Sequence, residues 1–370
     1  MSVPVARRNV FHHKGKLVLS VLSIGAALAM ILLLLGFREG LYAAMTAYAN
    51  NLGVDLIVAQ SGVKGIVSSS STLPIERHAQ IEELAGAQEA GHIITAGVIF
   101  TRADTKMPVI LIGYEPDANL GEPWKLGEGR TLLDNGEILL DTWLAQRAAV
   151  QVGDTVDLLG RQFEVVGLTR ETASWMSPYI FISLKDAQET LGLVNAVSFH
   201  LLRLRDGAGE ASARQAIEAQ VDGVDVIRPN EIADVDRRAI AAVMDRPISV
   251  LLLVAIIIGI AVMGLTSYTA ITDRIREYSL LKAVGASGFQ LNRLIVTEGL
   301  TMGVISLSVG IGLAFLSASL IMANWPQFNV VIRAESVVLA SLLALGMTLV
   351  SAFLPMRRLA GVDPIEAFKA

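Results

Sequence analysis

The chain has 370 residues, of which 53% are hydrophobic, and it carries a formal net charge of −5 with no cysteine. The lack of a basic excess argues against a nucleic-acid partner. The lack of cysteine excludes a disulfide framework, so any domain outside the cytoplasm must be held by its own hydrophobic core.

Four long apolar runs without a charged residue divide the chain unevenly. They cover residues 17–37, 247–272, 299–332 and 336–356. Each run supplies the roughly 20 apolar residues that a helix needs to cross the hydrocarbon core. The third run is too long for one span, and Asn324, Trp325 and Pro326 are expected to end its helix. The sequence therefore predicts four transmembrane helices in a 1 + 3 arrangement, at 17–37, 247–272, 299–323 and 336–356, with a short loop at 324–335.

The first run also follows basic residues, as a cleaved signal peptide does, but its 21 residues exceed the usual apolar region of roughly 7–15 residues. We therefore interpret it as a retained anchor. Basic residues are concentrated in segments 1–16, 273–298 and 357–370, whereas 324–335 holds only Arg333. The positive-inside rule places the three basic segments, and so both termini, in the cytoplasm.

Residues 38–246 then form a domain on the opposite, extracytoplasmic side. It contains 18 Lys and Arg against 29 Asp and Glu. Short β-type runs, as at 54–60 and 196–204, alternate with helix signals such as the capping pair Ser183 and Asp186, which predicts an α+β fold. A helix starting near Asn230 can continue into the second span, either as a rigid stalk or as a structural connector bent at Pro247.

The sequence shows no catalytic or metal-binding motif. It lacks the phosphate-binding G-x-x-x-x-G-K-[ST] pattern and the H-E-x-x-H zinc pattern. Its five histidines, which are scattered along the chain, are His12, His13, His78, His92 and His200. The four spans contain no Asp, Glu, Lys, Arg or His, which argues against a proton-driven transporter. We therefore expect no catalytic residue, no metal, and no enzyme activity in this chain.

Small residues recur in the spans, at Gly25, Ala29, Gly303, Gly310 and Gly312. Small residues allow helices to approach closely, so we expect helix packing here, within the chain or in a dimer. The alternative is the ordinary enrichment of glycine in membrane helices.

The loop 273–298 carries the strongest local signal. Ile271, Ile275, Tyr278 and Leu281 follow a helical stripe, Gly285 is placed to end that helix, and Ser287 with Gln290 predicts a capping box for the next one. The pattern predicts a helical hairpin with a tight corner, either a docking site for another protein or a solvated turn.

The stretch Arg276-Glu277-Tyr278-Ser279-Leu280-Leu281-Lys282-Ala283-Val284-Gly285-Ala286-Ser287 resembles a signature of the MacB/FtsX/LolC superfamily of ABC transporter permeases. The ending Arg357-Arg358, with Asp363, Pro364 and Glu366, is similar to that family's C-terminal motif. The segment Gly36-Phe37-Arg38-Glu39-Gly40-Leu41 looks like the DevC branch. Span order, domain position and both motifs together cover nearly the whole chain. Tyr278-Ser279 departs from the family pattern, where a small residue or glycine is common at the second position.

The resemblance implies a permease subunit of an ABC exporter in the bacterial cytoplasmic (inner) membrane, with a MacB-like periplasmic core domain at 38–246. Loop 273–298 would be the coupling helix, and mechanotransmission would carry ATP-driven movement to that domain. The implied coupling residues are Arg274, Arg276, Glu277, Tyr278, Leu281, Lys282, Ala283, Gly285, Ala286 and Ser287.

The implied partners are an ABC ATPase that holds ATP and Mg²⁺, a second permease copy in a homodimer, membrane lipids, and a membrane-fusion adaptor with an outer-membrane channel. The implied cargo is a lipid, a glycolipid or another amphiphile. One alternative is an FtsX-like regulator of envelope or cell-wall hydrolases. A receptor-like membrane protein without an ATPase is the other.

Overall fold

A computed structural model describes residues 14–102, 105–132, 134–172, 177–273, 275–325, 327–353 and 356–357. The chain divides into two compact units. The membrane unit contains residues 1–39, 244–324 and 330–370, and the sheet unit contains residues 40–243 and 325–329. Each unit is described by itself.

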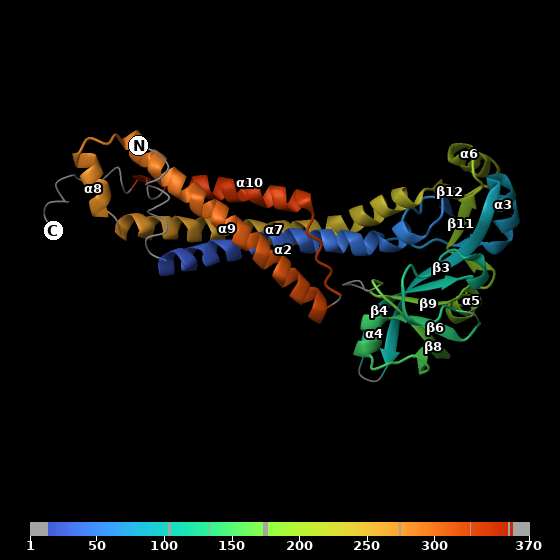
Figure 1. The fold of residues 1–370 in the computed structure, drawn as a ribbon. Coiled ribbons are helices and arrows are strands. Elements are labelled where there is room, and N and C mark those ends of the chain that lie inside the picture. The colour runs from blue at the N-terminus through green and yellow to red at the C-terminus, as the bar shows by residue number, and fades with distance from the viewer. Residues whose placement is uncertain are drawn as a thin grey trace. The chain divides into compact units, whose positions relative to one another are not determined.

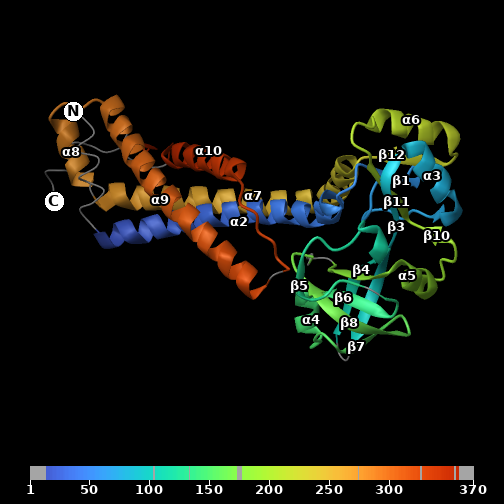
Figure 2. The same cartoon turned by 45° about the vertical axis from the view of Figure 1, so that its right-hand side comes forward.

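Four helices of the described chain are long and apolar enough to cross a membrane. They are α2 (Lys14–Asn51), α7 (Pro229–Asp273), α9 (Gly288–Asn324) and α10 (Ala334–Ser351). Within the membrane unit, α2 and α7 run side by side and α9 crosses them obliquely (Figure 1, Figure 2). Helix α7 continues through Pro247 without interruption. The described chain thus has one such helix, then the sheet unit, and then three more such helices. This order confirms the predicted fold class.

The core of the membrane unit is made of aliphatic and small side chains. Leu28, Ile31 and Leu32 of α2 are completely buried, as are Ala314 of α9 and Ala340 of α10. Alanine at the facing positions lets the helices approach closely. The bundle is therefore organised around α2, the first helix of the described chain.

The sheet unit is built on one mixed sheet. Its strands lie in the order β12-β1-β11-β3-β4-β9-β6-β8-β5, with β7 paired to β8, and β2 and β10 pair separately. The bounds are β1 Leu56–Gln60, β2 Leu73–Pro74, β3 Ala87–Arg102, β4 Thr105–Tyr114, β5 Leu126–Gly129, β6 Glu137–Asp141, β7 Thr155–Leu158, β8 Arg161–Thr169, β9 Tyr179–Ser183, β10 Ala196–Val197, β11 Phe199–Leu204 and β12 Val224–Ile227. The pairs β4–β9 and β6–β8 are parallel and the others are antiparallel. The mixture of strands and helices confirms the predicted α+β domain.

Each face of this sheet is covered by helices. One face packs against α3 (His78–Ala85), α4 (Thr142–Arg147), α5 (Leu184–Leu191) and α6 (Glu210–Gln220). The other face packs against the end of α2, through Tyr48 and Leu52, and the start of α7, through Ile232. Short 3₁₀ turns at Ile75–Arg77 and Pro116–Ala118 complete the unit. Because helices cover both faces, side chains on either side of the central strands are buried, as in β6 and β9.

Some local expectations need correction. A proline just before a helix-forming run, as Pro74 is, typically occupies the first turn of the helix. Pro74 is instead the last residue of β2, and the helix begins after a 3₁₀ turn. The long strand β3 was not expected at all. Gly86 and Gly192 do end α3 and α5 in the left-handed conformation, as their positions predict.

A buried carboxylate holds the Gly/Ser-rich loop that follows β1. Asp236 of α7 is completely buried. It accepts hydrogen bonds from the backbone N–H groups of Ile66 at 3.2 Å, Val67 at 3.3 Å and Ser68 at 3.0 Å, and from the Ser68 hydroxyl. A charge buried with several donors is stabilised, whereas the same charge without them is strongly unfavourable. The loop is therefore fixed onto α7 by one side chain.

Candidate functional site

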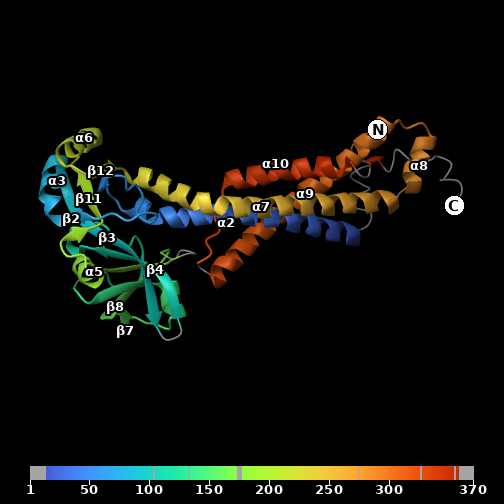
Figure 3. The ribbon, with the colours of Figure 1, turned by 180° about the vertical axis from the view of Figure 1, so that it is seen from behind.

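The loop predicted as a coupling element forms a helical hairpin. Helix α8 (Ile275–Ala283) is followed by a corner and then by α9 (Figure 3). Gly285 has a φ of +99°, which only glycine adopts readily. Its N–H donates to the Lys282 carbonyl at 3.1 Å, and the Ala286 N–H donates to the Leu281 carbonyl at 2.9 Å. These two bonds are the Schellman pattern that ends a helix.

The predicted capping box at the start of α9 is present. The Gln290 N–H donates to Ser287 Oγ at 3.3 Å, and the Ser287 N–H donates to Gln290 Oε1 at 3.0 Å. The two side chains thus satisfy donors that a helix start leaves unpaired. The corner is consequently closed by hydrogen bonds on both sides.

One side of the hairpin is packed. Tyr278, Ile271, Leu291 and Ile295 are buried in one cluster, and Leu281 and Ala286 are partly buried against it. The Tyr278 hydroxyl donates to Glu298 at 3.1 Å. Tyr278, Leu281 and Ala286, predicted as coupling residues, therefore face inward and hold α8 against α9.

The other side of the hairpin is exposed and contains apolar side chains that were not among the predicted coupling residues. Val284 is 88% exposed, Phe289 is 78% exposed and Leu280 is 49% exposed. The predicted residues Arg276, Glu277, Gly285 and Ser287 are exposed on the same hairpin, and Lys282 is half-buried. Leu280 and Val284 lie four residues apart, off the inward stripe, and that spacing could have revealed them.

Several predicted site residues lie outside the described residues. They are Arg274, Asp363, Pro364 and Glu366, and the side chain of Ala283 is also not described. Their roles stay predictions.

The predicted small residues differ in their surroundings. A Cβ at Gly310 of α9 would lie 2.8 Å from the carbonyl oxygen of Gly25 in α2, so these two backbones touch. Ala29 is buried in the same bundle. A Cβ at Gly303 would lie 3.0 Å from Thr348 Oγ1 of α10, whereas one at Gly312 would meet no described atom within 4 Å. Gly25 and Gly310 therefore form the tightest of these contacts.

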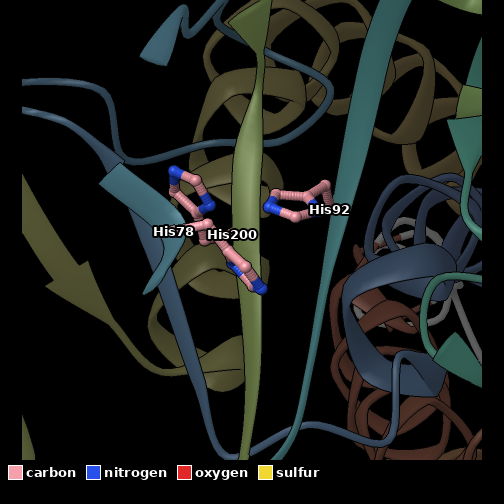
Figure 4. Close-up of side chains that lie close together, drawn as sticks. All are labelled: His78, His92 and His200. Carbon is pink, nitrogen blue, oxygen red and sulfur yellow. The ribbon is translucent and has the colours of Figure 1, made fainter. Parts of the chain in front are cut away.

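Three of the five histidines are not scattered in space, which corrects the expectation from sequence. His92 of β3 and His200 of β11 are direct cross-strand partners, and His78 is the first residue of α3. One ring nitrogen of each lies within 4.8 Å of those of the others. Figure 4 shows His92 pointing from its strand toward the other two rings. No local signal marks this cluster, because sheet pairing creates it.

Few of the ring nitrogens in this cluster have a partner. His92 Nδ1 lies 2.9 Å from Glu115 Oε2, and His78 Nε2 lies 3.6 Å from Glu82. Among the described residues, no hydrogen-bond partner exists for His92 Nε2, His78 Nδ1 or either nitrogen of His200. A buried polar group without a partner costs about 1–3 kcal/mol. A shared ligand would remove that cost.

The electrostatics keep two of these rings neutral. Burial lowers the pKa of His200 to about 3, with His92, His78 and Arg77 adding to the effect. Burial, followed by the proximity of His92, also lowers the pKa of His78. Burial alone raises the pKa of Glu115, but the hydrogen bond from His92 holds it below its ordinary value. Neutral imidazoles beside a carboxylate offer lone pairs rather than charge.

Comparison with known proteins gives two matches to protein families. The MacB-like periplasmic core domain matches residues 17–220, and the FtsX-like permease C-terminal region matches residues 249–364. The uncharacterized ABC transporter permease Rv0072 of Mycobacterium tuberculosis is 23% identical over 366 residues, 98% of each chain. The uncharacterized ABC transporter permease YknZ of Bacillus subtilis is 25% identical over 267 residues, 66% of each chain.

Solved structures give weaker similarities. The periplasmic region of MacB from Actinobacillus actinomycetemcomitans is 15% identical, with a TM-score of 0.39, over 50% of this chain and 94% of the other. The extracellular domain of YknZ from Gram-positive bacteria is 13% identical, with a TM-score of 0.37, over 47% of this chain and 99% of the other.

Proposed function

The chain belongs to the MacB/FtsX superfamily of ABC transporter permeases, and from this premise we propose that it transmits ATP-driven movement from a cytoplasmic ATPase to its sheet unit. A permease of an ABC transporter implies an ATPase partner. We propose that this partner holds the ATP and Mg²⁺, because the chain has no phosphate-binding motif of its own.

The exposed side of the α8–α9 hairpin is the observation that carries this proposal. Val284 and Phe289 are among the most exposed large apolar side chains of the described chain. Exposed apolar groups beside charges such as Arg276 and Glu277 are typical of a docking surface. The Schellman corner and the capping box hold these groups in a fixed position. We infer that the ATPase covers this surface and pushes on it.

Helix α7 offers a path for the movement. It starts at Pro229, within the sheet unit, and ends at Asp273, just before the hairpin. A continuous helix keeps its backbone hydrogen bonds along its length and resists bending. We therefore favour the rigid stalk over the bent connector for the segment that follows Asn230.

The remaining features of the proposal concern location and assembly. The basic segments 1–16, 273–298 and 357–370 support a cytoplasmic location for both termini and the hairpin, in a bacterial inner membrane. We propose that two copies pair and that the sheet unit works outside the membrane. By its DevC-like segment, the chain would work with a membrane-fusion adaptor and an outer-membrane channel to export a lipid, a glycolipid or a related amphiphile.

Co-purification tests the docking surface. The chain is co-expressed with candidate ABC ATPases from its own genome and extracted in detergent. We expect Val284→Glu and Phe289→Glu each to lower the recovered ATPase at least 10-fold, since a carboxylate would be buried at the interface. Val194→Glu is the matched control, because Val194 is 79% exposed in the sheet unit. Equal recovery in all variants would refute the assignment of this surface.

The second candidate function is regulation of an envelope or cell-wall hydrolase, which the resemblance to the FtsX branch implies. Proteoliposomes that contain the chain and its ATPase separate the two functions. ATP-dependent release of labelled lipid to an added adaptor supports export. ATP-dependent activation of a hydrolase, without lipid release, supports regulation and refutes export.

A further inference from the structure

We propose that His78, His92 and His200 bind a late first-row divalent cation, with Zn²⁺ as the foremost candidate, inside the sheet unit. The proposal is independent of the proposed transport function. It rests on the convergence of three imidazoles from β3, β11 and α3 whose inward nitrogens have no partner among the described residues. It replaces the expectation from sequence that the chain binds no metal.

The backbone already places the three rings for one ion. His92 and His200 face each other across an antiparallel pair, and α3 packs over both strands with His78 at its start. Tetrahedral Zn²⁺ with bonds of about 2.0–2.1 Å holds its ligand nitrogens about 3.4 Å apart. The observed separations of up to 4.8 Å close to that value by small rotations of the side chains.

Neighbouring carboxylates orient two of the rings. Glu115 accepts from Nδ1 of His92, which leaves the buried Nε2 as a lone-pair donor. Glu82 lies near Nε2 of His78 and leaves Nδ1 in the same condition. A metal-bound histidine usually donates its second N–H to such a carboxylate, and this contact fixes the tautomer. His92 thus has the arrangement of a ligand before any ion is considered, whereas His78, at 3.6 Å from Glu82, needs a small side-chain movement to form the same hydrogen bond.

The donor set selects the class of metal. Three imidazole ligands suit Zn²⁺, Cu²⁺, Ni²⁺ and Co²⁺, whereas Mg²⁺ and Ca²⁺ require oxygen ligands. The nearby cation, Arg77, donates to the carbonyl of Asp222, and the carboxylates of Glu115 and Glu82 oppose its charge. The three histidines leave one position of a tetrahedral ion for water.

The site would fasten α3 to the centre of the sheet. His92 is 4% exposed and His200 is completely buried, but His78 is only half-buried and provides a route of entry. An ion that binds the folded chain and not the unfolded chain stabilises the fold by mass action. We assign the ion this structural role.

The test uses the full chain in detergent micelles, without a polyhistidine tag. His12→Gln and His13→Gln are introduced first, because two adjacent histidines near the N-terminus could bind Zn²⁺ by themselves. After treatment with a chelator, the protein is titrated with ZnCl₂ in a calorimeter. We expect one Zn²⁺ per chain, imidazole scattering in the X-ray absorption spectrum, and a rise in Tm on addition of Zn²⁺.

Variants separate this site from adventitious binding. Glu115→Gln keeps all three rings and should weaken Zn²⁺ binding about 10- to 100-fold. His78→Ala removes a half-buried ligand and should weaken it further. Glu83→Gln, next to Glu82 and exposed on α3, is the control and should bind Zn²⁺ normally. Circular dichroism checks that each variant is folded. Absence of stoichiometric binding in the starting chain, or unchanged affinity in the folded His78→Ala and Glu115→Gln chains, would overturn the proposal.

Discussion

The sheet unit and the apolar spans of the membrane unit bury their side chains in different ways. In the sheet unit, carboxylates are taken out of water and surrounded by donors. Asp186, for example, accepts from the Gly136 N–H at 2.7 Å and the Ser183 hydroxyl at 2.8 Å, and pairs with Arg161 at 3.1 Å. In the membrane unit, the hydroxyls of buried Thr348 and Ser351 donate to carbonyls of their own helix, and Thr348 Oγ1 also lies 3.9 Å from the Met263 sulfur of α7.

The difference follows from the solvent. In water, a buried charge with several partners fixes a loop or a strand end in one arrangement. In hydrocarbon, apolar surface gains little from contact with other apolar surface, so close packing of small residues has to hold helices together. The two units should therefore respond differently to the loss of one charge and to the gain of one methyl group.

The largest expected effect is the loss of a buried carboxylate from the sheet unit. Asp236→Ala removes the acceptor of four donors in the loop that contains Ile66 and Ser68, which should destabilise the unit by about 3 kcal/mol. Thermal unfolding and amide hydrogen exchange of this loop measure the loss. Asp225, which accepts from Ser61 and Gly62 in the same loop but is only half-buried, is the control. An Asp225→Ala effect as large as that of Asp236→Ala would contradict this account.

The next effect tests close packing in the membrane unit. Gly310→Ala places a methyl group 2.8 Å from the Gly25 carbonyl oxygen and should cost about 1–3 kcal/mol. Gly312→Ala, on the same helix, meets no described atom within 4 Å and should leave Tm unchanged or raise it. Thermal unfolding in one detergent compares the two variants. Similar losses in both would show that helix α9 is not packed through Gly310.

A smaller effect is expected at the hairpin corner. Gly285→Ala forces a side chain into a backbone conformation with φ of +99°, at a cost of about 1–2 kcal/mol. Because a Cβ there touches no described atom, the cost comes from the backbone alone. The equilibrium constant that favours the corner conformation should fall roughly 5- to 30-fold, and substrate-stimulated ATPase activity should fall with the loss of that conformation. Gly288→Ala, at the start of α9, should behave like the unaltered chain, and a matching loss there would count against a special role for Gly285.

The smallest effect concerns pH. Burial raises the pKa of Asp141, although Thr172 and Trp143 donate to it. The folded chain therefore keeps this proton to higher pH than the unfolded chain does. The stability that Asp141 contributes falls as pH rises above about 3.8, by at most about 1.4 kcal/mol per pH unit. Asp141→Asn cannot ionise, so its Tm relative to the unaltered chain should rise between pH 4 and pH 7. A constant difference would contradict the raised pKa.

Local features of this fold could be predicted from sequence because both partners lie within a few residues of each other. Ser183 with Asp186 and Ser287 with Gln290 are capping pairs three residues apart, and both form. The spans were also predictable, since composition alone determines them. The roles assigned to the predicted coupling residues stay predictions.

Distant partners could not be predicted. Asp236 holds a loop 168 residues away in the chain, and sheet register alone brings His92 opposite His200. Strand β3 was not predicted because Ala, Gly and Glu interrupt its apolar pattern, and these residues are depleted in strands. The outward apolar side chains Val284 and Phe289 lie outside the inward stripe of α8, so that stripe did not predict them.

The contact between α2 and the last helices has a consequence for how the protein is made. Gly25 meets Gly310, the Val331 N–H donates to the Gly36 carbonyl at 2.9 Å, and Arg333 lies 3.4 Å from Glu39. All these partners of α2 are synthesised after residues 40–243 of the sheet unit. During translation, α2 must therefore wait in the bilayer while residues 40–243 emerge and fold. A ribosome that stalls before residue 310 would leave an anchored, folded domain with an open helix face, which is a natural substrate for membrane quality control.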